Sequence, residues 1–128
     1  MSYPELLTAD EKLADAKKRL NIPRIVVICG STRFWQEMAD AAWNETVVGR
    51  IVVKPDVDMK RPGAVYTDAQ AVKTDLDELH RAKIRLADEV LIVNPGGYVG
   101  QSTTAEIAYA RELGKPVRFT HPEADPAA

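Results

Sequence analysis

Apolar residues along this chain form two alternating patterns. In one they recur at helical intervals, and in the other they form short unbroken runs. Near the start, Leu13, Ala16 and Leu20 recur at helical intervals. Thr8 precedes them, and Glu11 follows Thr8 by the three-residue spacing of a capping box. We therefore expect an opening helix over residues 9–20, which ends before the proline at position 23.

Short, continuous apolar runs then alternate with further helical patterns. The runs are rich in Val and Ile, which is typical of strands buried on both faces of a parallel sheet. They cover residues 24–29, 50–54, 90–93 and 117–119. Helical spacing predicts helices over residues 34–45, 72–86 and 103–113, the last closed by Gly114 in the left-handed conformation.

This alternation of strands and helices predicts the fold class. Right-handed crossovers produce a mostly parallel sheet with helices on both faces. We expect a flavodoxin- or Rossmann-like, doubly wound, three-layer α/β/α domain with strand order 2-1-3-4. The domain spans residues 23–120, with a helical extension packed on it (1–22) and a flexible tail (121–128). Ligands of such sheets bind at the carboxyl ends of the strands, here beside strands 1 and 3.

Composition narrows the class of protein. A length of 128 residues, 45% hydrophobic and 28% charged, suits one folded domain. The net charge of −2 and the absence of basic runs argue against a nucleic-acid polymer as partner. No apolar run reaches membrane-helix length, and the chain start is unlike a signal peptide, so a cytoplasmic protein is expected. The single cysteine cannot form an internal disulfide.

Two sequence features bear on metal and thiol chemistry. The two histidines are not clustered in sequence with Cys or Asp, so no metal site is expected. Cys29 ends a predicted buried strand, and no histidine or cation stands near it in sequence. We therefore expect it to be an inert small hydrophobe.

The first candidate loop is Gly30-Ser31-Thr32-Arg33, between the first strand and the next helix. Backbone N–H groups and two hydroxyls at a helix start favour an anion, and a guanidinium can bind phosphate through two hydrogen bonds. An ordinary glycine turn with Ser31 or Thr32 as helix N-cap fits the same spacing. The segment is neither a Walker A loop nor G-x-G-x-x-G.

The second candidate loop runs from Asn94 to Glu106 and follows the third strand. Glycines there allow close approach of a ligand to the backbone, and hydroxyls lie at the next helix start. The expected binding residues are Asn94, Gly96, Gly97, Gly100, Ser102 and Thr103.

Glu106 has two interpretations. With Thr103 as N-cap, it would close a capping box and serve only the helix end. However, the residues three, four and seven positions later, Tyr109, Ala110 and Leu113, place it on a largely apolar helix face. An inward carboxylate beside a glycine loop is a candidate for catalysis, which is the interpretation we favour.

Three further features have open roles. His80 lies on the helix before the third strand and is either a hydrogen-bonded, partly buried side chain or a proton-transfer group. Trp35 and Trp43 are expected in the core or at a subunit interface. The polar loop over residues 55–66 could act as a lid.

Three motifs of this chain resemble those of a known group of enzymes. Cys-Gly-Ser-Thr-Arg at 29–33, Ala-Asp at 87–88 and a glycine loop leading into Glu-Ile-Ala-Tyr-Ala from Glu106 resemble the nucleoside 2-deoxyribosyltransferase-like superfamily. That superfamily includes the 2′-deoxynucleoside 5′-phosphate N-hydrolases and nucleotide N-glycosidases. The resemblance spans about residues 24–119. Pro-Gly-Gly-Tyr at 95–98 also resembles the cytokinin-activating phosphoribohydrolases, although the spacing to Glu106 is longer here.

The resemblance implies cleavage or transfer at the N-glycosidic bond of a nucleoside 5′-monophosphate, without cofactor or metal. Ser31 and Arg33 would hold the sugar or its phosphate, and Glu106 would attack the anomeric carbon. Hydrolase members carry an aspartate where this chain has His80, so His80 is the candidate acid/base partner. A homodimer is expected to close the site. The alternative is a nucleotide-binding sensor without catalysis.

Overall fold

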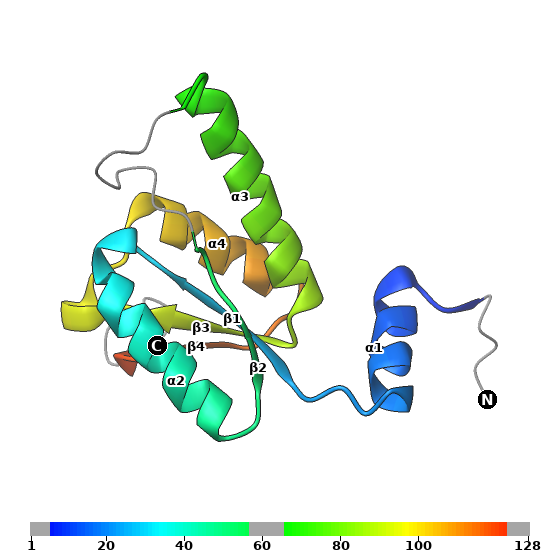
Figure 1. The fold of residues 1–128 in the computed structure, drawn as a ribbon. Helices are drawn as coiled ribbons and strands as arrows, with labels where there is room; N and C mark the ends of the chain where they lie inside the picture. The colour runs from blue at the N-terminus through cyan, green and yellow to red at the C-terminus, as the bar shows by residue number, and fades with distance from the viewer. Residues whose placement is uncertain (1–5, 57–65, 123–128) are drawn as a thin grey trace.

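The structure, a computed structural model, describes residues 6–56 and 66–122. Its elements follow the expected alternation, and Figure 1 shows their arrangement. The helices are α1 (Ala9–Arg19), α2 (Trp35–Val47), α3 (Ala69–Leu86) and α4 (Gln101–Glu112), with short 3-10 turns η2 (Thr32–Phe34) and η3 (Pro95–Gly97). The strands are β1 (Ile25–Gly30), β2 (Ile51–Val53), β3 (Glu89–Val93) and β4 (Val117–Phe119).

The sheet is all-parallel, with the order β2-β1-β3-β4. This confirms the predicted α/β class and strand order. β1 and β3 are the two central strands, and Gly30 at the end of β1 lies opposite Val93 at the end of β3. The carboxyl ends of these strands, and the loops that follow them, therefore meet at one edge of the sheet.

The core has two halves because side chains alternate between the faces of each strand. One half packs beneath α2 and comprises Val26, Ile28, Leu91, Val93, Met38 and Ala41. The other packs against α3 and α4 and includes Val27, Cys29, Val90, Ile92, Ile84, Ile107 and Ala110. Both faces of the sheet are thus covered, which accounts for the continuous apolar runs in the sequence.

α3 is longer than the strands beside it. At about 1.5 Å per residue its 18 residues span about 27 Å, whereas the five residues of β3 span about 17 Å. The end of α3 must join β3 at the amino edge of the sheet, so its first turns extend beyond the carboxyl edge (Figure 1). This overhang brings the middle of α3 level with the ends of β1 and β3.

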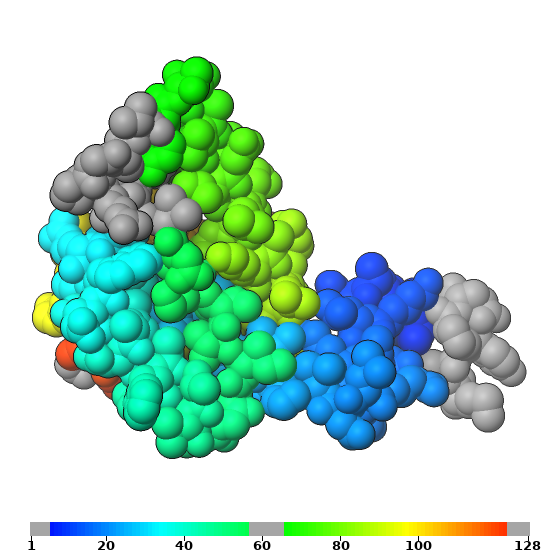
Figure 2. All heavy atoms as spheres, viewed as in Figure 1, coloured from blue at the N-terminus to red at the C-terminus, as the bar shows by residue number. Residues whose placement is uncertain are grey.

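α1 stands beside the sheet and covers neither face (Figure 1). Figure 2 shows the same helix projecting from the body of the molecule. The predicted capping box between Thr8 and Glu11 is present, and every residue of α1 is at least partly exposed. Lys17 connects the helix to the domain, because its ammonium donates to the carbonyl of Leu86 at 2.6 Å and to Asp88 at 3.1 Å.

Some sequence-based expectations differ from the structure. Trp43 is 72% exposed and Trp35 is 42% exposed, so neither lies in the core, and a subunit interface stays a prediction for both. The ammonium of Lys54 lies over the ring of Trp35, 4.9 Å from its centre. The predicted lid over residues 55–66 falls largely on residues 57–65, outside the described residues. Within the described part of the chain, no helix is both long and apolar enough to cross a bilayer.

Asp88 holds the start of β1 against the end of α3. Its carboxylate accepts the Ile25 N–H at 2.8 Å and contacts Lys17 at 3.1 Å. Burial disfavours its ionised form, but the Ile25 N–H, Lys17 and the more distant Arg24 outweigh burial and hold the pKa of Asp88 below its ordinary 3.8. The ionised carboxylate therefore stabilises the folded state.

We expect Asp88→Asn to lower the free energy of unfolding at neutral pH by about 1–2 kcal/mol, as measured by urea denaturation. The pKa of Asp88 is lower in the folded than in the unfolded protein. The stabilisation by its ionised carboxylate is therefore fully present above the unfolded pKa and is lost as pH falls through the folded pKa. The difference between the proteins should therefore shrink in acid. Asp15→Asn, which breaks only the exposed pair with Arg19, is the control and should change little. An equal loss in both variants would contradict this role for Asp88.

Candidate functional site

A cavity of about 460 Å³ opens at the carboxyl edge of the sheet, between the two predicted loops and the overhanging part of α3. This volume lies within the range of small-molecule sites. Its wall mixes hydroxyl, cationic, acidic and aromatic groups. The residues are Gly30, Ser31, Thr32, Arg33, Pro55, Lys73, Leu76, Asp77, His80, Tyr98, Gly100, Gln101, Ser102, Thr103 and Glu106.

The first loop contributes Gly30 to Arg33 to the cavity wall, as predicted. Glycine is required where β1 ends, because a Cβ at Gly30 would lie 2.8 Å from the carbonyl oxygen of Val93. Ser31 caps the following 3-10 turn, with its hydroxyl accepting the Arg33 N–H at 3.4 Å. The capping alternative is therefore present in the structure, and it coexists with a position on the cavity wall.

Tyr98 connects the two loops. The guanidinium of Arg33 lies 4.1 Å from the centre of the Tyr98 ring, and Phe34 meets the same ring edge-on at 5.8 Å between centroids. This stacking holds Arg33 at the rim of the cavity. In the sequence Tyr98 stands out only as part of a family motif, and its position in the site was not predicted. An aromatic residue inside a glycine loop was the available indication.

Three residues of the second loop that were predicted to bind a ligand are not on the cavity wall. The cavity wall, as far as the described residues define it, does not include Asn94, Gly96 or Gly97. Asn94 is fully buried, and its amide donates to the carbonyl of His121 and accepts the N–H of the same residue. Gly96 and Gly97 have φ values of 66° and 80° and form a turn. These residues shape the loop and tie it to the end of β4.

The other part of the second loop lines the cavity, as predicted for Gly100, Ser102 and Thr103. α4 begins at Gln101 with Gly100 as N-cap, two residues earlier than expected. Thr103 is therefore inside the first turn and buried, and Glu106 lies in the second turn. The capping-box interpretation of Glu106 is wrong, and its carboxylate is free for another role.

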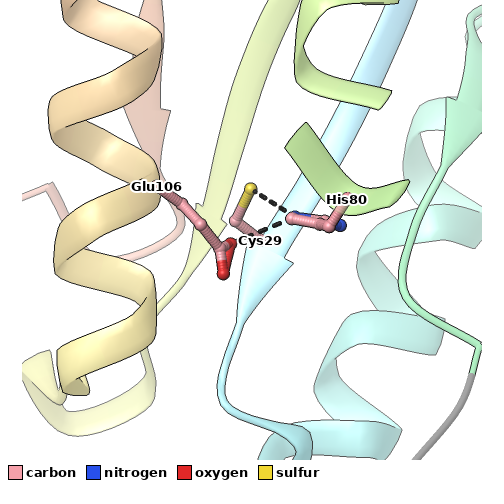
Figure 3. Close-up of side chains that lie close together, drawn as sticks. All are labelled: Cys29, His80 and Glu106. Carbon is pink, nitrogen blue, oxygen red and sulfur yellow. Dashed lines mark hydrogen bonds and ion pairs between the residues drawn. The ribbon is translucent and has the colours of Figure 1, made fainter. Parts of the chain in front are cut away.

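Glu106, His80 and Cys29 converge at the base of the cavity (Figure 3). Oε2 of Glu106 lies 3.0 Å from Nε2 of His80, and Sγ of Cys29 lies 3.2 Å from the same nitrogen. The side chains come from α4, α3 and β1, three elements that are far apart in sequence. Glu106 and His80 retain 21% and 12% side-chain exposure, respectively, whereas Cys29 is fully buried.

This convergence corrects two expectations. Cys29 does have a histidine neighbour, and a histidine does lie with cysteine and glutamate in a cluster that could hold a metal ion. Local sequence gives no sign of either contact, because 51 residues separate Cys29 from His80. Only the overhang of α3 past the sheet edge brings them together.

The thiol of Cys29 is held in its protonated form. Burial raises the pKa of Cys29 well above its ordinary 9.0, and the charge and hydrogen-bonding of Glu106 raise it further. Because the thiolate is the nucleophilic form of cysteine, Cys29 by itself is not an activated nucleophile. Among the three residues, Glu106 is the group best suited to act as one.

Two charged residues of α3 line the cavity but were not predicted there. Lys73 and Asp77 form an ion pair of 3.0 Å along the helix, and both are about half exposed. Asp77 was expected on a solvated face, and its exposure agrees, although the overhang turns that face toward the cavity. A second hollow of about 110 Å³ lies beside Asp77, Arg81 and Ala105 and also reaches His80 and Glu106.

Comparison of this chain with protein-family models, with curated proteins and with solved structures finds no match. The resemblance seen in the motifs therefore remains an expectation.

We expect iodoacetamide to modify Cys29 in the native protein much more slowly than in the urea-unfolded chain, because burial both keeps the reagent from the thiol and raises its pKa, which leaves less thiolate. Mass spectrometry of the single cysteine gives the rate. The pH at which the modification rate reaches half its maximum should lie above 9.0. This pH should be lower in Glu106→Gln, because that substitution removes a charge that raises the pKa of Cys29. Glu112→Gln, an exposed position on the same helix, is the matched control. Equal rates in the native and unfolded protein would refute the assignment.

Proposed function

We propose that this protein cleaves the N-glycosidic bond of a nucleoside or deoxynucleoside 5′-monophosphate, with Glu106 as nucleophile. One observation carries the proposal: the partly buried Glu106 carboxylate shares a cavity with the Gly30–Arg33 loop. A nucleophile and an anion-binding loop in one cavity of about 460 Å³ match the two ends of a sugar phosphate. The motif resemblance points to the same bond.

The proposed reaction proceeds in two displacements. Glu106 attacks the anomeric carbon while the bond to the base breaks, and the bonding electrons leave with the base. Water then attacks the glycosyl ester, so that the sugar gains a hydroxyl group and Glu106 returns as a carboxylate. A second base in place of water would give transfer instead of hydrolysis.

His80 is the proton partner in this scheme. Its Nε2 lies 3.0 Å from Glu106, so the imidazole can orient the carboxylate that attacks. In its protonated form it can give a proton to the leaving base, and in its neutral form it can then accept one from the attacking water. This role replaces the aspartate that the resemblance would place on α3.

The phosphate would bind at the rim of the cavity. Arg33 is held there by Tyr98, and Ser31 and the backbone N–H groups of the loop lie beside it. Binding energy gained at the phosphate, which does not react, can position the sugar against Glu106. Lys73 supplies a further cation on the cavity wall, although its ion pair with Asp77 partly neutralises the charge.

We expect release of free base when the protein is incubated with a panel of ribo- and deoxyribonucleoside 5′-monophosphates, including 5′-phosphates of N6-substituted adenosines. Chromatography of the products provides the measurement. Glu106→Gln should lower the rate at least about a thousandfold, the scale on which loss of a bond-forming group acts. Glu112→Gln should retain the wild-type rate.

The outcomes separate the candidate functions. Base release that is unchanged in Glu106→Gln would refute Glu106 as the nucleophile. Binding of a nucleotide without release of base from any member of the panel would refute the enzyme and favour the sensor.

Arg33→Met should lower kcat/KM for the 5′-monophosphate by about 10- to 100-fold, because a charged hydrogen bond to phosphate is worth about 1.5–3 kcal/mol. The same substitution should leave kcat/KM for the corresponding nucleoside nearly unchanged, since that substrate has no phosphate. Arg19→Met, on α1 and paired with Asp15, is the control. A similar loss with both substrates would show that Arg33 supports the loop and does not bind phosphate.

A further inference from the structure

The cluster at the base of the cavity has a property that the proposed reaction does not use. It presents three different donor atoms, the sulfur of Cys29, the Nε2 nitrogen of His80 and a carboxylate oxygen of Glu106. All three lie within 4.8 Å of one another. Figure 3 shows the three side chains side by side, each from a separate element, with Cys29 and Glu106 both joined to His80.

Hydrogen bonding, which includes one between Cys29 and Glu106, leaves two buried polar atoms of this cluster without a partner in the described part of the chain, Nδ1 of His80 and Oε2 of Glu106. In a nucleophile–histidine–acid relay the nucleophile and the acid contact opposite ring nitrogens. Here both contacts fall on Nε2 of His80, which carries at most one proton. Oε2 of Glu106 is buried and makes no hydrogen bond of acceptable geometry within the described part of the chain, although it lies 3.0 Å from Nε2.

We propose that Cys29, His80 and Glu106 form a binding site for one divalent transition-metal ion, and that Zn²⁺ fits it best. Sulfur, imidazole nitrogen and carboxylate oxygen are the donors that zinc takes, and a thiolate disfavours Mg²⁺ and Ca²⁺. Around a tetrahedral zinc, such donors lie roughly 3.3–3.6 Å apart. The observed separations of 3.0 and 3.2 Å come within a few tenths of an ångström of that range.

Charge and coordination number support the same assignment. A divalent ion balances one thiolate and one carboxylate, with the imidazole neutral. The ion would also reverse the electrostatics that keep the Cys29 thiol protonated, because a coordinated thiol loses its proton. Three protein ligands beside an open cavity leave the fourth position for water or a ligand atom, as in catalytic zinc sites.

Metal binding would oppose the proposed glycosidase step at the same carboxylate. The ion draws negative charge from Glu106, which makes the carboxylate a weaker nucleophile, and His80 cannot carry a proton on a coordinated nitrogen. The metal-loaded protein should therefore release base more slowly. Only this consequence rests on the proposed function; the metal site itself does not.

The test is an optical titration of the full-length protein, freed of metal with EDTA, with Co²⁺. We expect saturation at one ion per chain, a thiolate-to-cobalt charge-transfer band and the intense visible bands of tetrahedral cobalt, all lost on addition of Zn²⁺. Since Cys29 is the only cysteine of the sequence, the charge-transfer band reports this residue alone. Absence of that band at saturating Co²⁺ would overturn the proposal.

Variants then test whether the three residues act together. His80→Ala and Glu106→Gln should each raise the Kd for Co²⁺ at least about tenfold, a loss that even outer-sphere partners produce. Cys29→Ser should lack the charge-transfer band, with circular dichroism to verify its fold. His121→Ala is the matched control, because it removes the only other histidine and should leave the titration unchanged.

The remaining outcomes are decisive as well. A band that keeps its affinity in both His80→Ala and Glu106→Gln would mean that cobalt binds the thiol alone, and would overturn the proposal. A loss in His121→Ala equal to that in His80→Ala would do the same. Because the titration uses no substrate, failure to release base leaves its result intact, and failure to bind cobalt leaves the glycosidase proposal standing.

Discussion

The parallel pairing of β1 with β3 is the contact on which the rest of the site depends. It brings the end of one central strand so close to the other that Gly30 has no room for a side chain beside the carbonyl of Val93. Both loops leave the sheet from this pair. Their separation is therefore fixed by backbone hydrogen bonds in the core, and Arg33 and Phe34 of one loop can pack against Tyr98 of the other.

Much of the fold could be predicted because it follows from local patterns. Continuous Val and Ile runs identified buried parallel strands, and the switch between β1 and β3 identified the edge where a cavity forms. Element ends were less predictable. α4 starts two residues before Thr103, because the backbone of Gly100 and not a hydroxyl side chain forms the cap. That small shift decides whether Glu106 closes a helix or lines the cavity.

The parts of the candidate site that lie within a single loop could be predicted. The contacts between residues far apart in sequence could not. Gly30 to Arg33, together with Gly100, Ser102 and Thr103, line the cavity as predicted. Asn94 resembled a ligand-binding residue because polar side chains after a strand often are, yet its amide is used by the backbone of His121. The meeting of Cys29 with His80 has no local pattern at all, since it follows from the length of α3 relative to the sheet.

That excess length has a consequence for how the protein can change. The second half of α3 contributes Ile84 to the core, whereas Lys73 and Asp77 on its first half face the cavity and are about half exposed. Substitutions in the first half can therefore change the shape and charge of the cavity wall at little cost in packing. Packing of the core and composition of the cavity wall thus depend on different turns of one helix.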